Sequence, residues 1–130
     1  MKLYYLTIIG FMYFIPSASN YVFAADCQNA RNQTEMNQCA YSDLDHETKK
    51  INKTYNDYRA KLDPEQKQQL KEVQLAWIKF KDLACKFSAS GSEGGSIHPT
   101  ILAGCLTEKT RQRNKELEAL ANCEEGDMSC

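Results

Sequence analysis

The stretch DPEQKQQLKEVQLAWIKFKDLACKF, residues 63–87, carries the clearest structural signal in the chain. Its apolar residues recur in alternating steps of three and four, which is the spacing of one face of an α-helix. Asp63 followed by Pro64 is typical of a helix start, because aspartate caps the first turn and proline fits its first position. We therefore expect a helix over residues 64–89. Its buried face should comprise Leu70, Val73, Trp77, Phe80, Ala84 and Phe87.

A second helix is expected upstream of this stretch. Asn32 and Glu35 have the spacing of a capping box, in which two side chains satisfy the free amides of a helix start. Apolar residues then recur at helical spacing as far as Leu62. The pattern predicts a helix over residues 33–62, with Tyr55 on its buried face. Tyr55, Trp77 and Phe80 are our candidates for the structural core.

The third helix is expected after a glycine-rich connection. Residues 90–96 contain three glycines, whose backbone entropy opposes continued helix. Ser96 or His98 can cap the next helix, which should end near Ala121. The connections are short, so neighbouring helices should run antiparallel. No strand alternation is present. The sequence therefore predicts an all-α fold, a three-helix antiparallel bundle stapled by disulfides, after an N-terminal signal peptide.

The first 24 residues have the layout of that signal peptide. Lys2 precedes an apolar run from Leu3 to Ile15, and the small-residue site Val22-Phe23-Ala24 follows. The run is shorter than the roughly 20 residues that a membrane-spanning helix needs. We expect cleavage after Ala24, a helical domain over residues 25–122 and an acidic, cysteine-containing tail over residues 123–130. Localisation should be periplasmic, exported and soluble.

Charge and composition argue against several functional classes. The whole chain has a formal net charge of −1, and loss of Lys2 with the signal peptide makes this −2. A net charge this close to zero gives no positive electrostatic field that would attract nucleic acid or an anionic membrane. Asp26 precedes Cys27, whereas the residue before a lipid-modified cysteine is typically small. We therefore expect no nucleic-acid partner and no membrane anchor after signal cleavage.

All six cysteines follow the expected cleavage site, and an even number in an exported chain is typical of disulfides. Fifteen pairings are possible. In an antiparallel hairpin Cys85 and Cys105 lie near the same level, and Cys27 can fold back to Cys39, which leaves Cys123 and Cys130. The cysteine spacings fit no zinc pattern, so no metal and no cofactor are expected.

The ordered set of residues resembles the LprI lysozyme-inhibitor family. The resemblance is carried by Asp26-Cys27-Gln28-Asn29-Ala30, Glu35-Met36-Asn37, Cys39-Ala40, Asn52 with Tyr55, Gln74-x-x-Trp77-x-x-Phe80-Lys81-Asp82-x-x-Cys85, Gly94-Gly95-Ser96, Cys105-Leu106, Thr110, Arg113 and Glu116-Leu117. It covers nearly all of residues 26–120. It implies a small helical exported domain whose relatives include inhibitors of lysozyme, the hydrolase that cleaves peptidoglycan.

The function that we expect from sequence is inhibition of a lysozyme-type peptidoglycan hydrolase by steric occlusion. The candidate partner-binding residues are those of the glycine-rich loop, Ser92, Glu93, Gly94, Gly95 and Ser96. No catalytic residue is proposed, because no nucleophile lies beside either histidine in a recognisable motif. Two alternatives stay open. One alternative is an immunity protein that neutralises a secreted antibacterial toxin in the periplasm. The other is a non-enzymatic structural or chaperone module of the envelope.

Overall fold

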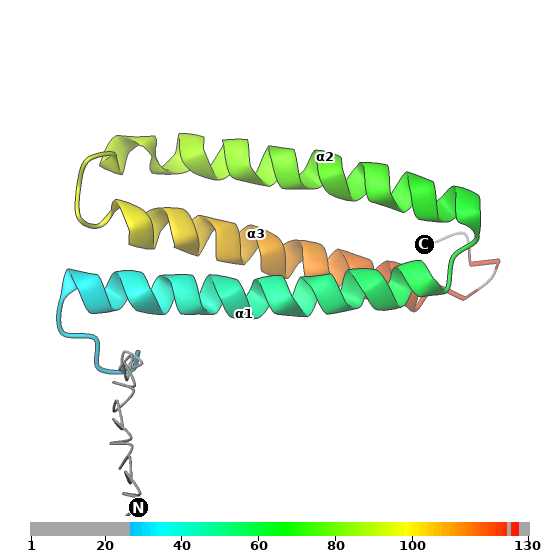
Figure 1. Ribbon diagram of the computed structural model, residues 1–130, viewed down its shortest axis with the longest axis horizontal. Coiled ribbons are helices and arrows are strands. Elements are labelled where there is room, and N and C mark those ends of the chain that lie inside the picture. Colours follow the sequence, from blue (N-terminus) through cyan, green and yellow to red (C-terminus); the bar gives the residue numbers. More distant parts are fainter. Residues whose placement is uncertain (1–26, 125, 128–130) are drawn as a thin grey trace, which may run out of the picture.

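The computed structural model describes residues 27–124 and 126–127, and these residues form three long helices. They are α1 (Gln33–Ala60), α2 (Pro64–Ala89) and α3 (His98–Ala121), with one 3₁₀ turn, η1 (Ser90–Ser92), after α2. Successive helices run antiparallel, and α3 lies between α1 and α2 (Figure 1). The all-α three-helix bundle predicted from sequence is therefore confirmed. The predicted signal peptide lies outside the described residues.

The starts of α1 and α2 follow the predicted capping chemistry, but the predicted cap of α3 by Ser96 or His98 is wrong, because its N-cap is Ile97 and no side chain caps it. The side chain of Asn32 accepts a hydrogen bond from the amide of Glu35 at 2.9 Å. Asp63 and Gln66 form a complete capping box at the start of α2, with Pro64 in the first helical position. α1 ends at Ala60, two residues before the predicted end, because the chain turns through Lys61 to the cap of α2. Local sequence thus determines where α1 and α2 begin.

The core of the bundle is small and lies toward the end where α1 connects to α2. Ile51, Leu70 and Leu117 supply one buried side chain from each helix. The partly buried residues packed against them are Tyr55, Tyr58, Leu62 and Trp77. Tyr55 and Trp77 therefore belong to the core, as predicted.

The predicted buried face of α2 is partly wrong. Leu70, Trp77 and Ala84 are buried or partly buried, as predicted. Val73 is 52% exposed, Phe80 is 61% exposed and Phe87 is 81% exposed, so none of these three is a core residue.

Gln74, Lys81 and Cys85 lie inward in their place. Gln74 turns inward because its side-chain oxygen accepts a hydrogen bond from Arg113 of α3 at 3.3 Å. Lys81 also turns inward, because its ammonium is attracted to the Trp77 ring and lies 5.3 Å from the ring centre.

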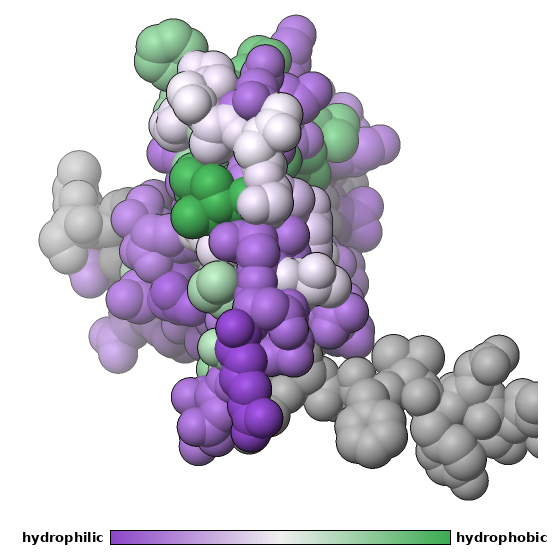
Figure 2. Space-filling view, turned by 90° about the vertical axis from the view of Figure 1, so that its left-hand side faces the viewer, coloured by the Kyte–Doolittle hydropathy of each residue, from purple (hydrophilic) through white to green (hydrophobic). Residues whose placement is uncertain are grey.

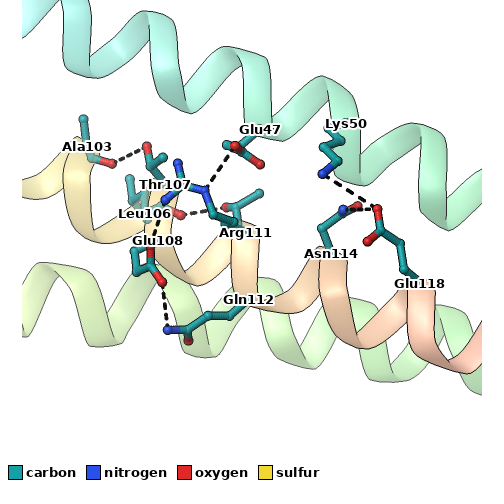
Figure 3. Close-up of polar contacts among 11 residues, drawn as sticks. Glu47, Lys50, Ala103, Leu106, Thr107, Glu108, Arg111, Gln112, Asn114 and Glu118 are labelled. Carbon is teal, nitrogen blue, oxygen red and sulfur yellow. Dashed lines mark hydrogen bonds and ion pairs between the residues drawn. The ribbon is translucent and has the colours of Figure 1, made fainter.

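α3 packs more closely against α1 than against α2, and the α1–α3 contact is largely polar. Thr107, Thr110 and Asn114 are buried along it, and both threonine hydroxyls donate back to their own helix. Figure 3 shows the two ion pairs that join the helices, Arg111 to Glu47 and Lys50 to Glu118. This seam fixes the register of α1 against α3.

Glu47 and Arg111 form the less exposed of these two pairs. The side chain of Glu47 is only 12% exposed, and its Oε1 lies 3.3 Å from Nε of Arg111. The hydrogen bond that Arg111 donates to Glu47 raises the pKa of the Arg111 guanidinium, against the lowering effect of desolvation. The second oxygen of Glu47 is buried without a hydrogen-bond partner. The ion pair with Arg111 is therefore the main interaction that offsets the loss of hydration of the Glu47 carboxylate.

Candidate functional site

Both disulfides resolved among the described residues lie at one end of the bundle. Cys27 pairs with Cys39, and Cys85 pairs with Cys105, so two of the predicted pairings are confirmed. The third predicted pairing, Cys123 with Cys130, involves a residue outside the described part of the chain. We call the region formed by residues 27–40 and 85–105 the disulfide end.

The Cys85–Cys105 bridge closes the hairpin that carries the glycine-rich loop. It links α2 to α3 with the two Cα atoms 5.6 Å apart, and Cys85 is fully buried. The Cys27–Cys39 bridge holds the lead-in segment against the second turn of α1. Each bridge closes a loop for which chain entropy gives a stabilisation of about 3 kcal/mol. The disulfide end is therefore covalently braced on both sides.

The loop itself is a succession of tight turns. Main-chain amides of Glu93, Gly95 and His98 donate to the carbonyls of Ser90, Ser92 and Gly95, at 3.0–3.2 Å. Gly94 has a φ of +78°, a conformation that side chains other than glycine rarely adopt. A Cβ added at Gly95 would lie 3.1 Å from the carbonyl oxygen of Ser92. Two successive positions thus favour glycine for geometric reasons.

His98 and Ser92 fasten the inner side of the loop. The Ser92 hydroxyl donates to the carbonyl of Ala89 at 2.7 Å and lies 3.0 Å from Nδ1 of His98. The same His98 nitrogen lies 3.2 Å from the Ala89 carbonyl. Both side chains are partly buried. The hydroxyl of Ser92, a predicted contact residue, is therefore engaged in hydrogen bonds within the loop. The other predicted contact residues, Glu93, Gly94, Gly95 and Ser96, are exposed.

Asn37 ties the loop to the first helix. Its amide nitrogen donates to the main-chain carbonyl of Ser96 at 3.1 Å. Its amide oxygen accepts from the Thr100 hydroxyl at 2.6 Å and from Gln33 at 2.9 Å. One side chain thus joins α1, the loop and α3. Sequence reasoning missed this network, since its members lie about 60 positions apart.

Apolar side chains surround the polar loop. Ile97 is 47% exposed immediately after it, and Phe87 is exposed just before it. Figure 2 looks onto this end of the molecule and shows green apolar spots set among white and purple residues. Large exposed apolar groups beside a rigid loop are typical of protein-binding surfaces. Sequence analysis missed Phe87 as a surface residue because it assigned Phe87 to the buried face of α2.

The described residues show no assembly for metal chemistry or membrane insertion. No group of three or more histidine, cysteine, aspartate or glutamate side chains among them is placed to hold a metal ion. No helix in the described ranges is long and apolar enough to cross a bilayer. The disulfide end thus presents a braced loop with exposed apolar side chains beside it.

Comparison with known proteins agrees with this geometry. The family model described as "Lysozyme inhibitor LprI" matches residues 24–117. An uncharacterised protein of Rhizobium meliloti (strain 1021) is 33% identical over 108 residues, which cover 73% of this chain and 78% of the relative. No solved structure matches.

Proposed function

Because this chain belongs to the LprI lysozyme-inhibitor family, we propose that it is an exported periplasmic protein that inhibits a lysozyme-type peptidoglycan hydrolase. It acts by binding rather than by turnover. The exposed part of the loop, Glu93 to Ser96, enters the substrate cleft of the hydrolase and occludes it. No cofactor takes part.

The observation that supports this proposal is the bracing of the loop. The Cys85–Cys105 bridge fixes the loop ends, the Asn37 amide holds its Ser96 carbonyl, and His98 holds its inner side. A loop that is already ordered loses little conformational entropy when it binds. Its glycine residues have no side chains, so the backbone of the loop can approach the wall of a cleft closely.

Phe87 and Ile97 supply the apolar part of the proposed interface. Hydrogen bonds from a polar loop largely exchange with water, so they give orientation more than affinity. Burial of a side chain as large as phenylalanine contributes about 1.5–3 kcal/mol. We therefore assign anchoring to Phe87 and Ile97, and exclusion of substrate to residues 93–96.

The test is lysis of cell walls by c-type lysozyme in the presence of the oxidised protein. We expect inhibition that increases with protein concentration and is lost when Ser96→Trp places a bulky ring on the loop. Gln68→Trp is the matched control, because Gln68 is exposed near the opposite end of α2. Absence of inhibition at a large molar excess, or equal inhibition by both variants, would contradict the proposal.

A further inference from the structure

A groove between α1 and α2, remote from the disulfide end, has an unusual lining. It has a volume of about 410 Å³ and begins near the turn that joins the two helices. A smaller cavity of about 110 Å³ adjoins it and shares Asn52, Gln74 and Ile78. Trp77 lines this inner cavity. The two together form one continuous site, which we call the α1–α2 groove.

All charged side chains that line the α1–α2 groove are basic. Arg59 of α1 and Lys71 of α2 line its outer part, and neither makes an ion pair with any described residue. Lys81 lines the inner cavity, where its ammonium lies over the Trp77 ring and 3.5 Å from Asp82. No carboxylate lines either part. The groove is therefore complementary to an anion.

Three side-chain amides add hydrogen-bonding capacity. Asn52 and Asn56 make no side-chain hydrogen bond with a described residue, and Gln74 uses only its oxygen, toward Arg113. By contrast, Gln68 and Gln112 on outer helix faces donate to neighbouring glutamates. An amide carries both donors and acceptors, which is the combination that pairs with hydroxyl and N-acetyl groups.

The apolar part of the outer lining comes from one aromatic ring of α1 and two aliphatic side chains of α2. Tyr55 contributes a partly exposed ring, and Leu75 and Ile78 form one wall. A helix that docks in a groove needs a continuous apolar floor, and amides interrupt this one. Isolated aromatic and aliphatic faces between amides suit the alternating polar and apolar surfaces of a sugar ring.

We propose that the α1–α2 groove binds a carboxylate-bearing saccharide. Arg59 and Lys71 bind the carboxylate, since charge-assisted hydrogen bonds are about twice as strong as neutral ones. Asn52, Asn56 and Gln74 bind the ring substituents, and the sugar extends toward Trp77. This site is separate from the loop proposed to contact the hydrolase, and its occupancy does not depend on that function.

The chain contains a single tryptophan, so its fluorescence reports on this groove. The probe is the disaccharide N-acetylglucosaminyl-N-acetylmuramic acid, a peptidoglycan fragment whose lactyl group carries a free carboxylate, titrated into the oxidised protein and followed by Trp77 emission and by calorimetry. We expect saturable binding that weakens at higher ionic strength. The neutral disaccharide N,N′-diacetylchitobiose should bind at least about tenfold more weakly, because it lacks the lactyl carboxylate.

The double substitution Arg59→Gln with Lys71→Gln should weaken fragment binding by about tenfold or more. Lys61→Gln with Lys67→Gln is the matched control, because it removes the same charge from two residues that do not line the groove. Circular dichroism confirms that each variant is folded. Absence of saturable binding by both methods, equal binding by the two double variants, or tighter binding of a hexaglutamate peptide than of the glycan would overturn the proposal.

Discussion

The side-chain amide of Asn37 donates to the main-chain carbonyl of Ser96 at 3.1 Å, and so the first helix holds the loop between the second and third. The two residues are 59 positions apart. The oxygen of the same amide accepts a hydrogen bond from the hydroxyl of Thr100 at the start of α3. The shape of the loop therefore depends on a residue that belongs to neither of the helices it connects.

Replacing Asn37 by alanine should loosen the loop without unfolding the bundle. Asn37→Ala removes bonds to Ser96, Thr100 and Gln33, with an expected cost of about 1–2 kcal/mol because the site is partly hydrated. Hydrogen exchange of the amides in residues 93–98 should accelerate. Gln38→Ala, an exposed change one residue along the helix, is the control. Unchanged exchange in Asn37→Ala would show that the turns of the loop are sufficient by themselves.

Removing the bridge between α2 and α3 should weaken both stability and inhibition. Replacing Cys85 and Cys105 together by alanine should lower the free energy of unfolding by about 3 kcal/mol, measured by urea denaturation. The buried position of Cys85 adds a small loss of packing. The Cys27 and Cys39 double variant should lose a similar stability but less inhibition, since it leaves the loop ends tied. Equal inhibition by the first variant and the parent would argue against a braced loop.

The Glu47–Arg111 pair should respond asymmetrically to mutation. Arg111→Met leaves the Glu47 carboxylate, which is 12% exposed, without its cation and should lower the free energy of unfolding. Adding Glu47→Gln to Arg111→Met should recover much of that loss. A double-mutant cycle by thermal or urea unfolding measures the coupling. A coupling near zero would contradict the assigned role of Arg111.

The same pair makes a prediction about pH. The pKa of Arg111 is raised in the folded state, so its contribution is fully present below the ordinary pKa of the guanidinium and is lost only as pH rises through the raised value. The destabilisation by Arg111→Met should therefore be equal at about pH 6 and about pH 9. A clear difference between those two measurements would mean that another titrating group controls the pair.

The outward position of Phe80 on α2 can be checked by comparing its truncation with that of a core residue of α3. Leu117→Ala, at a fully buried core position, should cost about 3–4 kcal/mol. Phe80→Ala should cost about 1 kcal/mol or less, because the ring is mostly exposed and its main contact is the ammonium of Lys109 at 5.2 Å. A loss at Phe80 as large as that at Leu117 would restore the face of α2 predicted from periodicity.

Local signals predicted the helices well. The caps at Asn32 and Asp63, the glycines of residues 90–96 and the helical spacing of apolar residues each act within a few positions. They are therefore readable without knowledge of the fold. The Cys85–Cys105 pairing followed from the antiparallel arrangement of the two helices, and the Cys27–Cys39 pairing from the short lead-in segment before α1.

The face of α2 was not predictable in the same way. Its sequence carries more apolar residues than one buried face accommodates, so periodicity alone favours the stripe through Val73, Phe80 and Phe87. The structure instead turns Gln74 and Lys81 inward, because Arg113 and the Trp77 ring provide partners for them. The partner of Gln74 lies 39 positions away, so it leaves no local pattern. For the same reason the Asn37 network and the lining of the α1–α2 groove emerged only from the structure.

The most direct test of the proposed inhibition is a hydrogen-exchange map of the protein with and without lysozyme. Binding by the disulfide end predicts protection of residues 87–98, with little change in residues 64–75 of α2. Protection confined to α2 and the α1–α2 turn, or no protection at a lysozyme concentration that exceeds the protein severalfold, would contradict occlusion by the loop.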